Sequence, residues 1–145
     1  MMKILLQRTD RVSIMVNGSQ VSSSGRGLLL LIGIGADDDE SSILYFIDKV
    51  TNLRIFEDKE GKMNLSVKDI GGDIAAVSQF TLYADTKKGR RPGFSLAAPP
   101  EKALKIYNKF VQELKRTGLN ISEGVFGAHM EISLVNNGPA TFMIE

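Results

Sequence analysis

The sequence contains no cysteine and only one histidine, His129, and each shortage excludes a class of chemistry. Without cysteine, the chain cannot form a disulfide framework, a thiolate nucleophile or a cysteine-based zinc site. A catalytic zinc ion usually takes at least one histidine ligand, and often two or three. A zinc site would therefore need His129 together with carboxylates, so we expect neither a metal ion nor another cofactor.

Long apolar runs and a strong net charge are also missing. The longest apolar stretch, at residues 28–34, has the length of a strand and is too short to span a bilayer. The apolar residues that follow Met1 are too few for the hydrophobic region of a signal peptide. The formal net charge is +1, so no global field draws the protein to a polyanion or a membrane. We expect a cytoplasmic protein whose polyanion contacts, if it has any, come from a local patch.

The length of 145 residues fits one domain, which we place at 1–145. Asn17-Gly18 predicts a hairpin turn after an alternating first strand, and the apolar run at 28–34 predicts a buried strand. Acidic residues at 37–40 open the first predicted helix, and Pro99-Pro100 opens the second. The predicted order is β-β-β-α-β-β-α-β-β, a mixed α/β domain.

Extended segments are predicted between and after the helices. Residues 53–56 and 73–83 have the pattern of strands, and alternation returns from Ile121 onwards. The Asn-Gly and Gly-Pro pairs within residues 136–141 predict a turn between two C-terminal strands.

The common catalytic motifs are absent. Gly33-Ile34-Gly35 begins like a dinucleotide-binding loop, but Asp38 stands where the third glycine of that motif belongs. No P-loop and no G-x-S-x-G nucleophile elbow occurs. A Ser-His-Asp triad would have to use His129, and a lone histidine on an alternating strand is more often an ordinary polar residue.

Three polar segments carry the remaining functional signal. Ser78-Gln79-Phe80-Thr81 follows a buried-looking strand, although such hydroxyl groups often satisfy only local backbone groups. Residues 136–141 have the composition of an ordinary turn, which does not exclude a functional one. The segment at 87–92 holds four cations in six residues: Lys87, Lys88, Arg90 and Arg91. Such a run is usually a solvated loop, but its position just after the first polar segment suggests a phosphate contact.

Together, these segments resemble the D-aminoacyl-tRNA deacylase family of bacteria and eukaryotes. The two motifs are Ser78-Gln79-Phe80-Thr81-Leu82 near mid-chain and Asn136-x-Gly138-Pro139-x-Thr141 near the C-terminus. The resemblance covers essentially the whole chain, and further matching segments are Gln7-Arg8, Leu53-Arg54-Ile55-Phe56, residues 61–66, Arg91-Pro92 and residues 124–130. The chain departs from the commonest family sequence at Thr9, Gly93 and Asn137, none of which the family's function requires.

The resemblance implies a single α/β domain in which mixed β-sheets pack in layers with two helices on one face (β/β/α). It also implies a homodimer with a site at each subunit junction. The catalytic segment of one subunit would consist of Ser78, Gln79, Phe80 and Thr81. The filter for substrate chirality would use the other subunit's turn, with a cis peptide bond, and would consist of Gly138, Pro139 and Met130. The implied substrate is the 3′ end of a tRNA that carries a D-amino acid, or glycine mischarged on the alanine tRNA.

An aminoacyl ester is already activated, so the implied reaction needs no strong nucleophile. Backbone N–H groups near Phe80 and Thr81 would hold the developing oxyanion. Thr81 is one possible nucleophile, and a water molecule activated by the ribose hydroxyl of the substrate is the other. We favour water because His129 is the only candidate base. The four cations at 87–91 are expected to contact the tRNA.

Three other functions are compatible with the sequence. An RNA-binding module would use the cationic loop without chemistry. A hydrolase of small D-amino-acid esters or peptides would act without RNA. A structural dimerisation domain would turn over nothing. The role of His129 stays open in each case.

Overall fold

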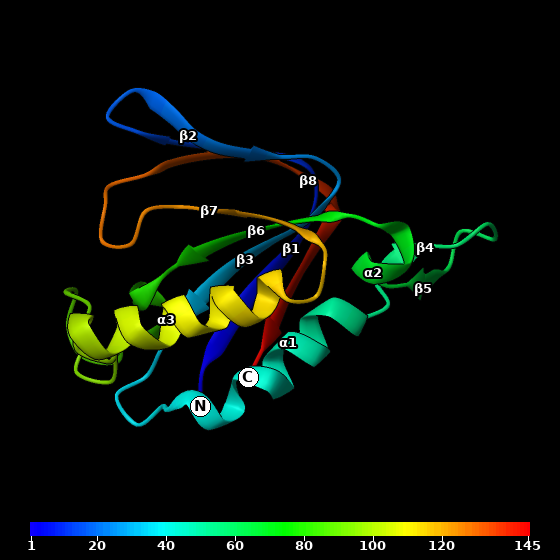
Figure 1. Cartoon of the computed structure of the whole chain (residues 1–145). Helices are drawn as coiled ribbons and strands as arrows, with labels where there is room; N and C mark the ends of the chain where they lie inside the picture. Colours follow the sequence, from blue (N-terminus) through cyan, green and yellow to red (C-terminus); the bar gives the residue numbers. More distant parts are fainter.

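The long first strand, β1 (Lys3–Val16), organises the main sheet because it pairs along both of its edges. One edge pairs antiparallel with β8 (Glu131–Ile144) along almost its whole length. The other edge pairs first with β3 (Gly27–Gly33) and then with β2 (Ser19–Ser24). The computed structural model describes residues 1–145 and shows this curved sheet with the helices gathered on one side (Figure 1).

The turn between β1 and β2 is the predicted hairpin. Asn17 and Gly18 both have positive φ, 51° and 77°, which is the backbone combination of a type I′ turn. This geometry matches the right-handed twist of the two strands that it joins. The hairpin prediction is therefore confirmed.

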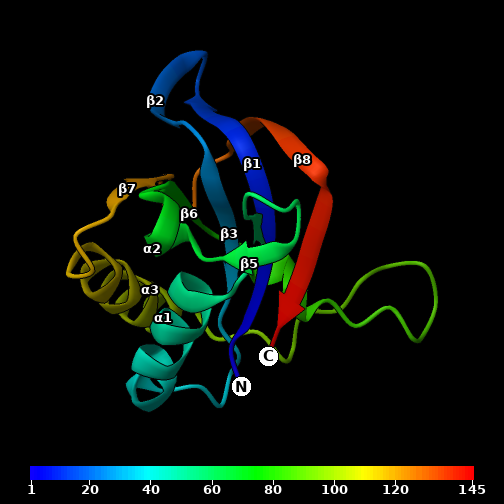
Figure 2. The ribbon, with the colours of Figure 1, turned by 90° about the vertical axis from the view of Figure 1, so that its right-hand side faces the viewer.

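Two parallel pairings complete the sheet, β3 with β6 (Asp73–Ser78) and β6 with β7 (Asn120–Glu123). Parallel neighbours need a crossover connection, and each crossover here carries a long helix. The first contains α1 (Ile43–Asn52) and the second contains α3 (Pro100–Lys115). Both helices lie on the same side of the sheet, on the left in Figure 2. None of the helices combines the length and the hydrophobicity that a membrane span requires.

The larger core lies between the sheet and these two helices. Phe46 of α1 and Phe110 of α3 are fully buried there, together with alternate residues of β1 such as Ile4 and Leu6. A smaller core lies on the opposite face of the sheet and consists of Val12, Ile14, Leu29, Ala75 and Val77. The expected layered α/β fold, with helices on one face, is confirmed.

Short elements fill the first crossover and the end of β6. They are the 3₁₀ turn η1 (Glu40–Ser42), the two-stranded sheet of β4 (Phe56–Glu57) and β5 (Met63–Leu65), the helix α2 (Val67–Ile70) and the 3₁₀ turn η2 (Phe80–Tyr83). A capping box starts α2, because Asp69 N donates to Ser66 Oγ (3.1 Å) and Ser66 N donates to the Asp69 carboxylate (2.8 Å).

Three segments differ from the predicted strands. Residues 53–55 are not in a strand, and the Ile55 carbonyl accepts a hydrogen bond from Arg8 instead of from a strand partner (2.7 Å). The strand predicted at 73–83 ends at Ser78, because Leu82 N donates back to Gln79 O (3.3 Å) and the chain turns into η2. The predicted turn at 136–141 does not separate two strands. It is an irregularity within the single strand β8, where the pairing with β1 shifts register.

We expect Phe110→Ala to destabilise the protein by about 3–5 kcal/mol, because it leaves a cavity in the larger core. Phe110 is 0% exposed, whereas Leu104 on the same helix is 39% exposed. Leu104→Ala is therefore the matched control, and it should change the free energy of unfolding by less than about 0.5 kcal/mol. Urea denaturation measures both values, and equal losses would contradict this description of the core.

Candidate active site

A cavity of about 700 Å³ opens at the carboxyl end of β6. One wall is formed by Ser78, Gln79 and Phe80, and another by the segment from Phe94 to Pro100. The remaining wall comes from residues 126–132, between β7 and the start of β8. The lining is mostly hydrophobic, 11 of 17 residues, with a few polar groups at one edge. This composition is typical of a small-molecule site, so the cavity is a candidate ligand site.

The segment from Ser78 to Thr81 changes from strand to 3₁₀ turn at the edge of this cavity. Gln79 N donates to Ile32 O of β3 (2.8 Å), so the chain is held against the sheet up to Gln79. The first hydrogen bond within η2 comes from Leu82 N. The N–H groups of Phe80 and Thr81 therefore precede the helical hydrogen bonds and are available to a ligand.

The polar side chains of this segment contact each other rather than an acid or a base. Gln79 Nε2 donates to Thr81 Oγ1, which is the hydrogen bond of the Thr81 hydroxyl in this structure. His129 is exposed, and its neighbours Ala128 and Met130 line the cavity. No group of three or more His, Asp or Glu side chains is arranged to hold a metal ion. The segment thus offers backbone donors and a hydroxyl without a paired base.

A buried tyrosine at the end of η2 anchors this 3₁₀ turn to the interior of the protein. The hydroxyl of Tyr83 donates to the Met1 carbonyl and lies 3.3 Å from the Asp38 carboxylate. Asp38 also accepts a hydrogen bond from Gly35 N (2.6 Å). Burial, and then the negative charge of Asp38, raise the pKa of Tyr83 well above its usual value. The phenol therefore stays protonated and remains a donor at neutral pH. The sequence offered no signal for this contact, because its members lie far apart along the chain.

Met130 lies in the same cavity as Ser78 and Phe80, on the wall formed by residues 126–132. Its sulfur would stand only 2.5 Å from a Cβ at position 124, so Gly124 makes room for it. Gly124 N donates to Ala76 O (3.1 Å), which ties this wall to β6. Within one chain, Met130 is therefore grouped with the catalytic segment and not with Gly138 and Pro139.

The turn at Gly138 and Pro139 is exposed on β8. The peptide bond between the two residues is cis, which confirms the geometry that the family resemblance implies. Gly138 has a φ of +151°, and a Cβ there would lie 2.5 Å from Ala140 N. A residue with a side chain would therefore distort the turn.

Arg8 braces this turn from the interior of the protein. Its side chain is buried and donates from Nε to Asn137 O (2.8 Å) and from Nη1 to Ile55 O (2.7 Å). Asn137 Nδ2 in turn donates to Asp10 Oδ1 (2.8 Å). The sequence indicated no role for Arg8 beyond the Gln7-Arg8 match, because its partners are carbonyl groups elsewhere in the chain.

The two family motifs lie far apart within one chain. Ser78 is level with Ile32 of β3, which pairs with Ile4 of β1. The Gly138 turn lies between the positions that pair with Gln7 and Thr9. The two motifs are three strand spacings apart across the sheet and several residues apart along β1. Together these displacements amount to roughly 20 Å. The Ser78–Thr81 segment and the Gly138 turn of one chain therefore do not belong to one continuous site.

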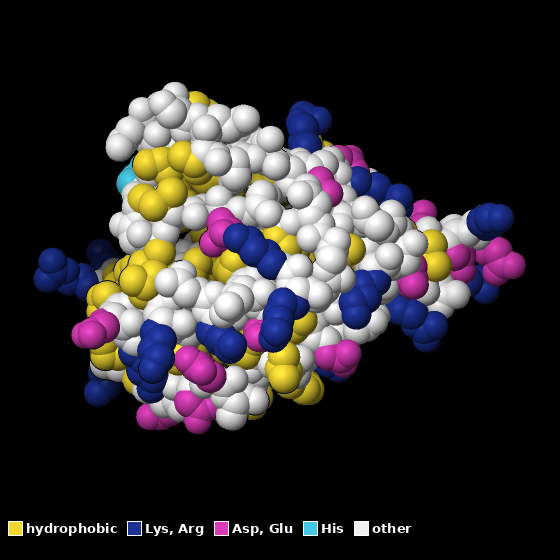
Figure 3. Space-filling view, in the orientation of Figure 1, with side chains coloured by type: hydrophobic (Ala, Val, Ile, Leu, Met, Phe, Trp, Pro, Cys, Tyr) yellow, Lys and Arg dark blue, Asp and Glu magenta, His cyan; other side chains and the backbone are white.

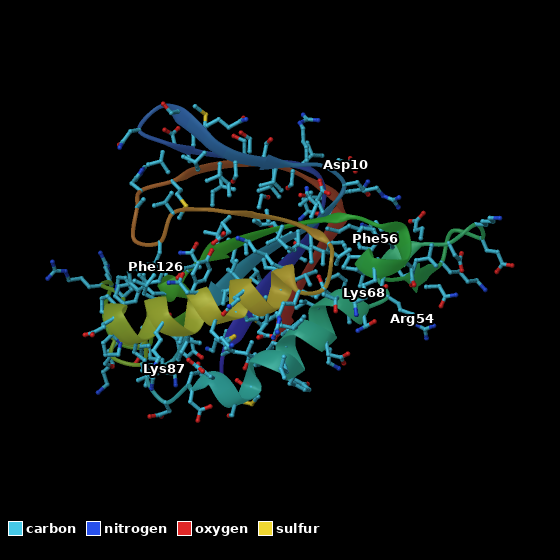
Figure 4. The ribbon with its side chains drawn as sticks, viewed as in Figure 1. Asp10, Arg54, Phe56, Lys68, Lys87 and Phe126 are labelled. Carbon is cyan, nitrogen blue, oxygen red and sulfur yellow. The ribbon has the colours of Figure 1, made fainter.

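The basic loop, residues 86–92, joins the catalytic segment to the cavity wall. Backbone hydrogen bonds in both directions between Asp85 and Gly93 (2.8 and 2.9 Å) close the loop at its base. The loop projects from the body of the protein (Figure 2), and Lys87 lies at the same end of the molecule as Phe126 of the cavity (Figure 4). Its exposed cations, none of which forms a salt bridge, are Lys87, Lys88, Arg90 and Arg91.

Comparison with known proteins gives one consistent family. The family model described as D-Tyr-tRNA(Tyr) deacylase matches residues 5–145. The D-aminoacyl-tRNA deacylase of Thermoanaerobacter pseudethanolicus is 47% identical over 144 residues, which cover 99% of this chain and 97% of that protein. The D-aminoacyl-tRNA deacylase of Thermomicrobium roseum is 49% identical over 144 residues, which cover 99% and 94%.

The fold agrees with this match. The solved structure of a c-Myc DNA unwinding element binding protein superposes with a TM-score of 0.93 and 41% identity, and the match covers 99% of this chain and 97% of that one. The matched region contains the cavity, the catalytic segment and the braced turn. The chain therefore belongs to the D-Tyr-tRNA(Tyr) deacylase family.

Proposed function

We propose that this protein is a hydrolase that cleaves the ester between a D-amino acid and the 3′ end of tRNA, releasing free tRNA and the amino acid. Its relatives are D-aminoacyl-tRNA deacylases. The observation that carries the proposal is the apolar cavity with free N–H donors at its edge and four unpaired cations on the adjoining loop. Those features complement an ester carbonyl and the phosphates next to it. Because tRNA is charged in the cytoplasm, we place the enzyme there.

The reaction needs only backbone donors and water. Water adds to the ester carbonyl carbon, and the N–H groups of Phe80 and Thr81 hold the oxyanion, where one such donor is worth about 3 kcal/mol. The bond between the acyl carbon and the ribose oxygen then breaks, and the leaving ribose oxygen takes the proton that the attacking water has lost. The ribose hydroxyl beside the ester activates the water, because the Thr81 hydroxyl contacts Gln79 and no base.

The active enzyme is a homodimer in this proposal. Leu5 pairs with Leu31 on one side and Met143 on the other, so the three side chains form an apolar row across adjacent strands. Successive side chains of a strand point to opposite faces of the sheet, so this row points away from the larger core, which holds Ile4 and Leu6. Met143 is 46% exposed. A second copy would cover the row by two-fold symmetry. It would also bring its Gly138 turn to the catalytic segment, which the turn of the same chain does not reach.

The Gly138 turn acts as the filter for chirality. Arg8 holds the backbone of the turn in place through Asn137 O. Residue 138 is glycine, so the turn presents its backbone, and no movable side chain, to the substrate. A rigid backbone corner rejects any L side chain that points into it, whatever the chemistry of that side chain. A D side chain points away from the corner, and glycine has nothing to clash. Glycine mischarged on the alanine tRNA is therefore a second substrate, and Met130 contacts the amino acid from the cavity side.

Matched D- and L-aminoacyl-tRNAs test this function directly. We expect hydrolysis of the D-ester to be faster by at least about 100-fold, which corresponds to about 2.7 kcal/mol between the two transition states. Glycyl-tRNA should be cleaved, and free D-amino-acid esters should react slowly because they lack the phosphates. Binding of tRNA without turnover would instead favour an RNA-binding module. Equal rates on free esters would favour a hydrolase that needs no RNA.

We expect Thr81→Ala to lower kcat by about 10- to 100-fold, because the substitution removes the contact that positions Gln79. Loss of a covalent nucleophile would cost far more, on the order of a millionfold. Single-turnover rates on D-aminoacyl-tRNA distinguish the two. Capture of an acyl-enzyme in the wild type would overturn the water mechanism.

We expect the wild type to sediment as a dimer at micromolar concentration and Met143→Lys to sediment as a monomer. The lysine would place a charge in the apolar row, where it would be desolvated on association. Leu44→Lys is the matched control, because Leu44 is 65% exposed on the helical side, away from the row. A monomeric wild type would contradict the dimer.

Mixed dimers test whether the site is shared between subunits. Thr81→Ala impairs the catalytic segment, and Gly138→Ala impairs the turn by placing a Cβ 2.5 Å from Ala140 N. A heterodimer of the two variants holds one junction with both parts intact. After subunit exchange, the mixture should therefore be more active than the mean of the two variants alone. No gain would show that both parts act within one chain.

A further inference from the structure

Two aromatic rings stand half-exposed at the rim of the cavity. Phe80 is 53% exposed and Phe94 is 36% exposed, and both line the cavity. Their ring centroids are 5.0 Å apart in an edge-to-face arrangement. In such a pair one ring directs its edge at a face of the other, so the contact between the two rings covers only one of their four faces. Neither side chain contributes to the two hydrophobic cores, so neither is explained by the packing of the fold.

The two aromatic residues flank the basic loop in the sequence, and they lie at its base. Phe80 precedes the loop and Phe94 follows it, and the Asp85–Gly93 hydrogen bonds bring the two ends of the loop together. In Figure 4, Lys87 marks this end of the molecule, and Figure 3 shows Lys and Arg side chains projecting there beside an apolar surface. Exposed aromatic rings next to unpaired cations are the arrangement with which proteins hold single-stranded nucleic acid.

The cavity itself is too small for more than the end of the substrate. A volume of about 700 Å³ is that of a site for one drug-sized molecule, such as an aminoacylated nucleoside. The next nucleotide of the unpaired 3′ strand must therefore lie outside the cavity, at its rim. Its phosphate would face the cations of the loop and its base would face the aromatic rings.

We propose that Phe80 and Phe94 stack the penultimate nucleobase of the tRNA, while the terminal nucleoside occupies the cavity. This inference rests on the proposed function and specifies how the same site holds its substrate. Phenyl rings offer no hydrogen-bond donor or acceptor, so the contact does not read the identity of the base. It adds affinity for any tRNA and fixes the direction in which the 3′ strand enters.

Deacylation of a minihelix substrate tests the contact. One D-aminoacyl minihelix carries the normal penultimate nucleotide, and the other carries an abasic residue there. We expect Phe94→Leu to raise KM for the normal substrate by roughly tenfold, the usual size of one base–aromatic contact. On the abasic substrate the wild type should already be weakened, and Phe94→Leu should add less than about twofold. Tyr45→Leu, which removes a ring that is 51% exposed on α1, is the matched control and should change neither value.

A fluorescence measurement gives a second readout that does not need turnover. The chain contains no tryptophan, so Phe94→Trp introduces a single reporter that keeps an aromatic face. Uncharged RNA with a normal 3′ end should quench its emission, and RNA with an abasic penultimate residue should not.

The possible failures are distinct. If Phe94→Leu raises KM equally on both minihelices and the tryptophan is not quenched selectively, the aromatic pair only shapes the cavity wall or contacts a second copy, and the inference is wrong. If the wild type hydrolyses no D-aminoacyl-tRNA at all, the proposed function fails, and the quenching experiment still decides whether the base is stacked.

Discussion

The pairing of β1 along both edges is the constraint on which the rest of the structure depends. β8 lies on one edge, and β3 followed by β2 lies on the other, so a single strand sets the register of the central sheet. The parallel pairing of β3 with β6 then places Ser78 level with Ile4, while Arg8 holds the Gly138 turn further along β1. The register along β1 therefore keeps the Ser78–Thr81 segment and the Gly138 turn apart within each chain.

The groups at the candidate site suit the chemistry of the proposed substrate. The candidate site offers amide N–H groups, a hydroxyl and an apolar wall, and its one nearby histidine is exposed. An activated ester does not require a strong nucleophile, so accurate placement of the carbonyl matters more than reactivity. Accordingly, several contacts around the candidate site fix the positions of its parts. Tyr83 anchors η2 to the Met1 carbonyl, Gly124 makes room for Met130, and Arg8 braces the Gly138 turn.

The sequence predicted those features that depend on neighbours along the chain. Alternation indicated β1, Asn17-Gly18 indicated the hairpin, and Pro99-Pro100 indicated the start of α3. The resemblance to the family also implied the cis bond between Gly138 and Pro139. Features that depend on distant partners were missed. The carbonyl of Ile55 bonds to Arg8 rather than to a strand, and the chain turns at Gln79 after its last sheet contact. Phe94 reaches the cavity because hydrogen bonds close the basic loop and hold the following residues beside Ile34.

The contacts of Arg8 have a consequence for how the enzyme responds to ionic strength. Arg8 is buried and holds the Gly138 turn through carbonyl oxygens, and it forms no salt bridge. Dissolved ions screen exposed charges strongly and buried contacts much less. The proposed contacts between phosphate and the exposed cations of the basic loop therefore weaken as salt rises, while the shape of the turn does not change. If the loop binds tRNA and the turn selects the D-configuration, as proposed, the two properties are separable: a concentrated salt solution weakens the first and leaves the second intact.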